Sequence, residues 1–343
     1  MESITMSSAN EILVEQLLCV NQRVCSQNCT KCQAVCPQNA IEINPKTGSV
    51  TLSSACTHCG LCIIECPAQA IYWHNLMRYP LKINEGKIEI FCTEIKCDGY
   101  ASCLANLNEY ELSYLALKAE VILCIDQAVC MQCNPTIAPH IHKVVDCVNQ
   151  FLANLDVRPI TFSVQQKKIA EQINRRELFS FVFTKLKQSI SEFLPAVEKP
   201  SEYRSLLVNE LQQRFAEAKG TVAPLFSGAK GLVNCTLCGT CVRACRNKAL
   251  QIVIDQDQNR GQLQHNQAVC TGCDICSILC PEKAIEISTE SSSLASIGKN
   301  KPTLVRERSL NNCKICGTAI VEGAQMFCQD CRRKQNEKMQ DIY

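Results

Sequence analysis

The stretch Cys56-Thr-His-Cys59-Gly-Leu-Cys62-Ile-Ile-Glu-Cys66-Pro67 decides what most cysteines of this chain are for. Three of its cysteines follow one another at three-residue intervals, and the fourth comes four residues later, directly before a proline. This spacing is typical of bacterial iron-sulfur sites, where a tight loop wraps one cluster with three thiolates and the fourth thiolate ligates a neighbouring cluster. Because the fourth thiolate needs that neighbour, the stretch predicts further copies of itself.

Three further copies are present, one upstream and two downstream, and corresponding cysteines of the two downstream copies are 35 positions apart. Their members are Cys25, Cys29, Cys32 and Cys36, then Cys235, Cys238, Cys241 and Cys245, then Cys270, Cys273, Cys276 and Cys280. Proline follows the last cysteine of every copy except one, where Arg246 stands instead. The sequence thus predicts two pairs of clusters.

The cysteine content would suggest a disulfide scaffold if the chain were short and secreted, since 28 of its 343 residues are cysteine. The first residues, however, show neither the basic and apolar regions of a secretory signal nor a twin arginine. We therefore expect a cytoplasmic protein with reduced thiols. No window approaches about 18 uncharged apolar residues, so we expect no membrane span.

Charge and aromatic content argue against nucleic-acid binding. Thirty-five Lys and Arg against 33 Asp and Glu leave a net charge of +2, and only 5% of the residues are aromatic, whereas nucleic-acid-binding faces are strongly basic and often carry stacking rings. The sequence also lacks a dinucleotide-binding loop, a Walker phosphate loop and a nucleophile elbow. The absence of a substrate motif favours electron carriage over enzyme action.

Residues 21–85 and 223–290 resemble bacterial ferredoxins that carry two 4Fe-4S clusters. The resemblance rests on the cysteine runs, on the Cys-Pro steps and on the Ala-Ile pairs that begin at Ala40 and Ala70. It implies crossed ligation, in which each cluster takes three cysteines from one run and the last cysteine of the other. The implied sets are Cys25, Cys29, Cys32 and Cys66; Cys36, Cys56, Cys59 and Cys62; Cys235, Cys238, Cys241 and Cys280; and Cys245, Cys270, Cys273 and Cys276.

Two positions depart from the ferredoxin pattern. Three residues separate Cys25 from Cys29 where the family has two. Arg246 replaces the usual proline, and a cation beside a cluster thiolate favours the more negative, reduced state. We therefore expect the cluster that Cys245 ligates to have the higher potential of its pair.

Residues 86–150 predict a small α/β domain. Lys87 to Phe91 and Val121 to Ile125 have the pattern of short buried strands, and Asn108-Glu-Tyr-Glu111 between them resembles a helix N-cap with glutamate at N3. Cysteines fall at the ends of these elements: Cys92, Cys97, Cys103, Cys130 and Cys133. The region distantly resembles the small iron-sulfur subunit of methanogen-type hydrogenases, which implies that four of these thiolates bind a further 2Fe-2S or 4Fe-4S centre. The alternative is a degenerate thioredoxin-like spacer with free cysteines.

The remaining segments predict connecting structure and a metal module. Helical spacing at Ile12, Leu13 and Leu17 predicts a short N-terminal helix, with Cys19 as a buried hydrophobe. Residues 151–222 contain no cysteine and predict a helical connector, and serine-rich residues 291–302 predict a flexible tether. Two knuckles beyond it, Cys313 with Cys316 and Cys328 with Cys331, resemble a zinc ribbon. A rubredoxin-type iron site is the rival interpretation.

Together these features predict an α+β chain in which two ferredoxin-like dicluster domains flank a small α/β domain and a helical connector. The expected segments are residues 1–85, 86–150, 151–222, 223–290, a tether at 291–308 and a zinc-ribbon-like module at 309–343.

The predicted function is electron transfer through four 4Fe-4S clusters to or from a partner oxidoreductase. The architecture is similar to that of multi-cluster proteins found with bacterial formate dehydrogenases and other molybdenum enzymes, which implies a partner of that class. The alternative hypothesis is an accessory or assembly factor for such a metalloenzyme. Nucleic-acid binding through Arg332, Arg333 and Lys334 is a third and weaker hypothesis, because three charges usually only solubilise a terminus.

Overall fold

The structure is a computed structural model, and the chain divides into two compact units, residues 1–225 and 226–343. The residues that the structure describes are 11–24, 29–74, 81–84, 86–92, 103–125, 130, 135–163, 200–215, 225–289, 292–321, 326–328 and 330–334. Cys25, Cys97 and Cys133 therefore lie outside the described residues, as does most of the predicted connector. Among the described helices, none is both long and apolar enough to cross a bilayer.

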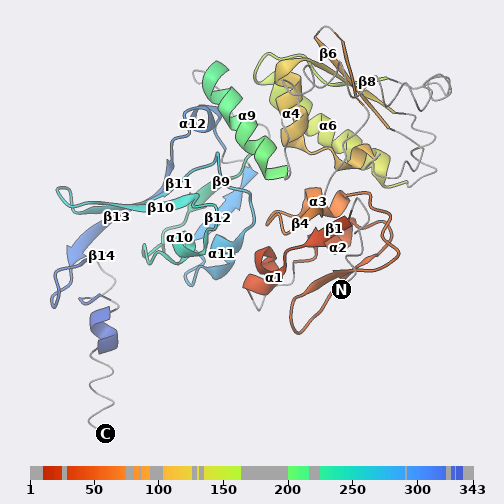
Figure 1. The fold of residues 1–343 in the computed structure, drawn as a ribbon. Helices are drawn as coiled ribbons and strands as arrows, with labels where there is room; N and C mark the ends of the chain where they lie inside the picture. Colours follow the sequence, from red (N-terminus) through yellow and green to blue (C-terminus); the bar gives the residue numbers. More distant parts are fainter. Residues whose placement is uncertain are drawn as a thin grey trace, which may run out of the picture. The chain divides into compact units, whose positions relative to one another are not determined.

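The first part of unit 1 consists of two short antiparallel strand pairs and four short helices (Figure 1). The strand pairs are β1 (Glu11–Val14) with β4 (Ile71–His74), and β2 (Ile41–Ile43) with β3 (Val50–Leu52). The helices are η1 (Gln16–Leu18), α1 (Val20–Arg23), α2 (Lys31–Val35) and α3 (Leu61–Glu65). The core combines apolar side chains such as Ile41 and Trp73 with the buried cysteines Cys32 and Cys62. Cysteine loops are thus part of this core.

The predicted N-terminal helix is wrong, because residues 11–14 form the strand β1. Ile12 pairs with Trp73 and Val14 with Ile71 in the antiparallel ladder that joins β1 to β4. The side chain of Ile12 is buried in the same core as Cys32. Pairing with a strand about 60 residues away outweighs the local spacing from which the helix was predicted.

The second part of unit 1 is a four-stranded sheet with helices beside it. Its strand order is β5 (Leu81–Asn84), β6 (Lys87–Phe91), β7 (Glu120–Cys124) and β8 (Thr161–Ser163). β5 runs antiparallel to β6, whereas β6, β7 and β8 are parallel. The helices are η2 (Leu104–Asn106), α4 (Glu109–Lys118) and α6 (Ile137–Ala153). The predicted strands and the helix that begins after Asn108 are confirmed.

The boundaries of this α/β part differ from the predicted 86–150. β5 lies before residue 86, and both the end of α6 and the strand β8 lie after residue 150. Asn149 on α6 exchanges two hydrogen bonds with the backbone of Ile160, at 2.8 and 3.1 Å, which fixes the entry to β8. The sheet recruits these flanking segments because its strands need partners on both sides of the predicted strands.

The helix α9 (Pro200–Arg214) packs on α4 within unit 1. Arg204, which is 4% exposed, donates to the hydroxyl of Tyr110 and lies 4.8 Å from the centre of that ring. The Tyr110 hydroxyl in turn donates to the carbonyl of Leu225 at 2.9 Å. Lys118 and Glu210 form an ion pair between the two helices. Of the predicted helical connector, the described residues 151–163 contain the end of α6 and the strand β8, and residues 200–214 form the helix α9.

Unit 2 repeats the arrangement of the first part of unit 1 and then extends it. β9 (Gly228–Gly231) pairs with β12 (Ile285–Ser288), and β10 (Leu250–Asp255) with β11 (Arg260–His265). The one-turn helices α10 (Thr240–Ala244) and α11 (Ile275–Leu279) follow the cysteine loops. β13 (Thr303–Asn312) continues the hairpin sheet on the far edge of β11, and β14 (Ala319–Val321) pairs with β13. The mixture of short helices and small sheets in both units confirms the α+β class.

Within the segment predicted as a tether, the described residues 292–308 contain a helix and part of a strand. α12 (Leu294–Gly298) buries Leu294 and Ile297, and residues 303–308 belong to β13. The side chain of Gln267 accepts a hydrogen bond from the backbone of Ser293 at 2.7 Å, which anchors the segment. The serine content predicted a flexible segment. Instead, the burial of Leu294 and Ile297 and the pairing of β13 with the edge of β11 give the segment a regular structure.

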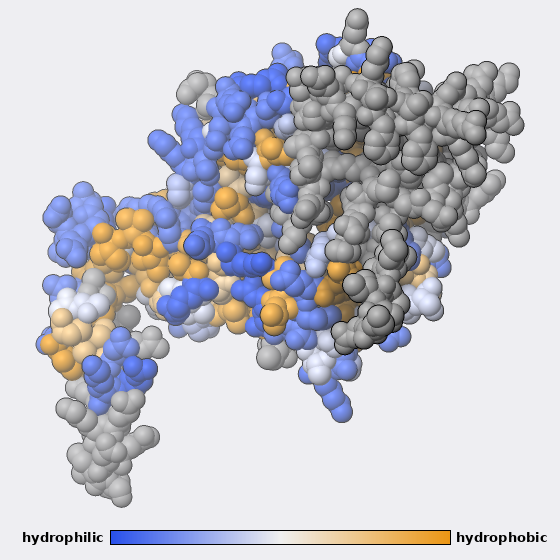
Figure 2. Space-filling view, viewed as in Figure 1, coloured by the Kyte–Doolittle hydropathy of each residue, from blue (hydrophilic) through white to orange (hydrophobic). Residues whose placement is uncertain are grey.

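Exposed apolar side chains gather where β10, β13 and the knuckles lie (Figure 2). The large apolar residues that are more than a third exposed in these segments are Val253 and Ile254 on β10, Leu304 on β13, and Ile315 and Met326 near the knuckle cysteines. All five belong to unit 2.

Candidate functional site

The last cysteine of each run ends a one-turn helix and is held by a backbone hydrogen bond. The sulfurs of Cys36, Cys66, Cys245 and Cys280 each accept from the N–H of the alanine four residues later, at 3.2, 3.3, 3.2 and 3.2 Å. The residue before each alanine has a positive φ: Asn39, Gln69, Lys248 and Lys283. The same turn therefore orients the sulfur in the same way relative to the local backbone in all four copies. The alanine N–H that contacts each sulfur would stabilise a thiolate at that position.

The three described cysteine loops share a backbone conformation that suits an anion. Positive φ values recur at two positions of each loop, on the residue before the second cysteine and on the residue after it. The residues are His58 and Gly60, Leu237 and Gly239, and Gly272 and Asp274. Alternation of right-handed and left-handed residues turns successive backbone N–H groups to one side and forms a concave anion site, which is common around iron-sulfur clusters. The loops therefore fit a negatively charged cluster.

In unit 1 the thiols form two groups that cross between the runs. The pKa of the Cys32 thiol is raised to about 12, first by burial and then by the neighbouring thiols of Cys66, Cys29 and Cys19. The pKa of Cys62 is raised by burial and then by Cys59, Cys56, Cys32 and Cys36. Cys66 thus lies beside the upstream run and Cys36 beside the downstream run. Bare thiols in such a buried group resist ionisation, so a metal centre is required to hold all of them as thiolates.

Unit 2 shows the same crossing on one side. The pKa of Cys241 is raised to about 11 by burial and then by Cys235, Cys238 and Cys280. The pKa of Cys276 is raised to about 12 by burial and then by Cys270, Cys273 and Cys241. Cys280 therefore lies with the first run of the unit. Asn247, two residues beyond Cys245, lies 3.3 Å from the hydroxyl of Thr271 in the second loop, which brings the Cys245 turn to that loop.

Cys19, which the sequence predicted as a buried hydrophobe, is only partly buried and lies beside thiols of the cysteine runs. It packs against the core that contains Cys32, and it is one of the thiols that raise the pKa values of Cys32 and Cys66. The side chain of Asn21 fixes the adjoining chain, because it accepts from the N–H of Cys29 at 2.6 Å and donates to the carbonyl of Cys29 at 2.9 Å. Cys19 falls outside the run spacing, so no sequence signal separates it from an ordinary core cysteine.

Three of the predicted middle thiols lie together beside the first dicluster region. The pKa of Cys103 is raised to about 12 by burial, and the neighbouring thiols of Cys92, Cys59 and Cys130 add to the rise. Cys92 directly follows β6, Cys103 directly precedes η2, and Cys130 is 5% exposed. The fold thus brings thiols from three segments to one place, next to a cysteine of the loop 56–62. Cys124, in β7, is 5% exposed and belongs to the core.

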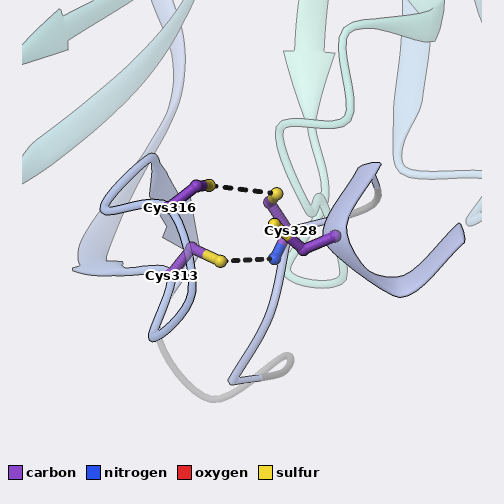
Figure 3. A group of neighbouring side chains, drawn as sticks. Cys313, Cys316 and Cys328 are labelled. Carbon is purple, nitrogen blue, oxygen red and sulfur yellow. Dashed lines mark hydrogen bonds between the residues drawn. The ribbon is translucent and has the colours of Figure 1, made fainter. Parts of the chain in front are cut away.

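The C-terminal cysteines form a separate and tighter site. The sulfurs of Cys313, Cys316, Cys328 and Cys331 all lie within 4.8 Å of one another. Figure 3 shows Cys313 and Cys316 on one knuckle facing Cys328 on the other, with 3.6 Å between the sulfurs of Cys316 and Cys328. A tetrahedron with metal–sulfur bonds of about 2.3 Å has edges of about 3.8 Å. The four thiols therefore fit one tetrahedrally bound metal ion.

Backbone donors pre-form this site. The N–H groups of Cys316 and Cys328 hold the pKa of Cys313 at about 6, and the Cys328 N–H lies 3.2 Å from the Cys313 sulfur. β14 pairs with the end of β13, and the Lys314 N–H donates to the carbonyl of Met326 at 3.1 Å, so the two knuckles are joined through the backbone. Among the described residues, no other three potential metal ligands lie this close together. The described cysteines of the runs that resemble ferredoxins do not form such a tight group, and their spacing suits an iron-sulfur cluster, which is larger than a single metal ion.

Comparison with known proteins agrees with this geometry. A family model described as a 4Fe-4S dicluster domain matches residues 24–70 and 234–284. The chain thus contains two dicluster domains, one in each unit, and these support multiple 4Fe-4S clusters. No curated protein matches the chain.

Proposed function

We propose that this chain with two dicluster domains is a cytoplasmic electron-transfer protein or subunit that relays single electrons through four 4Fe-4S clusters to or from a partner oxidoreductase. The dicluster domains support an iron-sulfur electron-transfer role. The observation that carries the proposal is the crossed grouping of thiols, with Cys66 beside Cys32 and Cys36 beside Cys62. Because each cluster takes its fourth thiolate from the other cysteine run, a short segment of chain joins the two clusters of a pair. This connection keeps the two clusters close enough for electron exchange.

The proposed ligands follow the same crossing in both units. They are Cys25, Cys29, Cys32 and Cys66; Cys36, Cys56, Cys59 and Cys62; Cys235, Cys238, Cys241 and Cys280; and Cys245, Cys270, Cys273 and Cys276. Bound clusters supply reversible one-electron chemistry over a wide range of potentials. The chain supplies thiolates, backbone N–H groups and burial, which set the potential of each cluster. Four thiolates close the coordination of a cluster, so a relay needs no substrate pocket beside it.

Two further centres complete the proposal. The thiols of Cys92, Cys103 and Cys130, with Cys97 and Cys133 as the remaining candidates, would bind an additional 2Fe-2S or 4Fe-4S centre next to Cys59. The four C-terminal cysteines would bind zinc, which is the usual occupant of a closed four-thiolate site on two knuckles. Zinc there is structural, because it has no redox chemistry and no open coordination position.

The test of the relay begins with anaerobic purification. Four cubanes bring about sixteen iron and sixteen sulfide ions per chain, and an additional centre raises both numbers. Cys276→Ser is expected to remove one cluster, whereas the matched control Cys147→Ser, on α6 and outside every run, keeps all of them. Cys103→Ser is expected to remove only the iron of the additional centre.

Electron transfer is then measured directly. The protein is reduced with dithionite, freed of reductant and mixed with an oxidised candidate partner, beginning with a formate dehydrogenase and other molybdenum enzymes. We expect reoxidation of the clusters together with reduction of the partner. A colourless protein, or clusters that exchange electrons with no oxidoreductase, would contradict the proposed function.

A further inference from the structure

Asn106 carries a buried amide that finds no partner among the described residues. The residue is 6% exposed, and neither its Nδ2 nor its Oδ1 has a hydrogen-bond partner. Leaving such a group unsatisfied is unfavourable, because it loses its hydrogen bonds to water on burial and gains none in return. Buried unsatisfied amides are rare, and each one requires a cause such as a missing ion or a redox role.

The amide lies directly on the cluster loop of the first dicluster domain. Asn106 is the last residue of η2, the turn that begins after Cys103. Its Oδ1 lies 1.3 Å from the position that a Cβ on Gly60 would take, and its Nδ2 lies 3.1 Å from that position. Asn106 therefore fills the space where a side chain of residue 60 would stand. Gly60, with φ of 78°, is the N-cap of α3 and follows Cys59.

The second dicluster domain shows that this contact is not a general feature of the loop. Gly239 occupies the matching position after Cys238, with φ of 75°. A Cβ there would meet only the end of the Arg243 side chain at 3.0 Å before the next neighbour, Ile252, at 3.7 Å. Cys59 is partly buried, whereas Cys238 is exposed. Within unit 1, the α/β part thus places a buried amide against the glycine of a cluster loop, and the matching glycine in unit 2 has no such amide beside it.

We propose that the Asn106 side-chain amide donates a hydrogen bond to the cluster held by the loop 56–62, and that this bond raises the reduction potential of that cluster. The inference rests on the proposed function. A cluster with four thiolates is negatively charged, so it selects the amide orientation in which the N–H faces sulfur. The positive end of the N–H dipole stabilises the reduced state more than the oxidised state, because the reduced cluster carries one more negative charge. Asn106 is a positioning and tuning residue, and it binds the α/β part to the first dicluster domain.

The test is a potentiometric titration followed by EPR on the full chain. Asn106→Leu keeps the size of the side chain and removes the donor. We expect it to lower the equilibrium constant for reduction of one cluster by threefold to tenfold, a shift of up to about 59 mV, and to leave the other clusters unchanged. Asn106→Asp, which places a carboxylate at the same point, is expected to shift the same cluster further in the same direction. Asn106→Gln, which keeps an amide, is expected to restore most of the potential.

A matched pair of glycine variants provides the second arm. Gly60→Ala and Gly239→Ala impose the same backbone strain, but only the first displaces Asn106. We expect Gly60→Ala to reproduce the shift of Asn106→Leu and Gly239→Ala to leave that cluster unchanged. Unchanged potentials in Asn106→Leu with full iron content would overturn the inference, as would loss of the cluster in both Asn106→Leu and Asn106→Gln. Absence of clusters from the unmodified chain would instead contradict the proposed function.

Discussion

Four single cysteines show how a local turn prepares a ligand. Cys36, Cys66, Cys245 and Cys280 each point a sulfur at the N–H of an alanine four residues ahead, at 3.2–3.3 Å. Proline follows three of them and Arg246 the fourth, yet the geometry is the same. Proline fixes one φ angle, but the shared left-handed residue and the N–H to sulfur bond suffice to form the turn. The departure at Arg246 is therefore electrostatic rather than structural.

The charge of Arg246 is expected to raise the potential of the cluster that we propose Cys245 ligates. Arg246→Gln and Arg246→Pro should both lower that potential in an EPR-monitored redox titration, because both remove the cation. The shift should be small and should shrink at high salt, since Arg246 is exposed and water screens its charge. A shift in Arg246→Pro alone would point to the backbone instead of the charge.

At the scale of elements, most of the structure near the thiols is too short to be stable alone. α3 and α10 have five residues each, far below the length at which an isolated helix persists. The strands β2 and β3 have three residues each. Such elements hold together through the shared core of apolar side chains and cysteines, and bound clusters would add covalent ties between them. Loss of clusters is thus expected to loosen the dicluster domains more than the α/β part.

α4 is the opposite case, because its start is encoded locally. Asn108 accepts a hydrogen bond from the Glu111 N–H at 2.8 Å, as the N-cap pattern predicted. Asn108→Ala should cost about 1 kcal/mol of helix stability, which is roughly a fivefold faster hydrogen exchange in the first turn of α4. Asn108→Asp keeps the acceptor and should exchange at nearly the native rate. Equal exchange in all three proteins would show that packing alone fixes the start of α4.

At the scale of the whole molecule, one pattern occurs twice and is extended differently each time. Unit 1 adds an α/β part and α9, whereas unit 2 adds β13 to the free edge of β11 and carries the knuckles at its end. The metal module is therefore continuous with the sheet of the second dicluster domain rather than joined through a tether. Because unit 2 has its own sheet and core, we expect it to fold without unit 1.

A fragment of residues 226–343 tests that independence. We expect it to bind about eight iron ions, from two cubanes, and one zinc. Its EPR spectrum should equal the part of the full-chain spectrum that the Cys276→Ser and Cys241→Ser variants of the full chain abolish. An insoluble or iron-free fragment would show that unit 2 depends on unit 1.

Removal of the C-terminal metal should have a local effect. A zinc chelator, or Cys313→Ser, is expected to abolish the order of the knuckles, because so short a segment has too little apolar surface to fold alone. The visible absorbance and EPR of the clusters should stay unchanged. Iron in place of zinc in the purified module, or loss of cluster signals with the zinc, would contradict this assignment.

The local chemistry of this protein can be read from its amino-acid order alone: the cysteine runs with their spacing, the knuckle pairs and the cap of α4. These features involve residues a few positions apart, where backbone geometry alone limits the possibilities. Only the tertiary structure decided that residues 11–14 form a strand, that the serine-rich segment supports α12 and β13, that Cys19 joins the thiols of Cys32 and Cys66, and that Asn106 covers Gly60. Each of these depends on contacts between distant segments, and no local spacing encodes which distant partner a segment will meet.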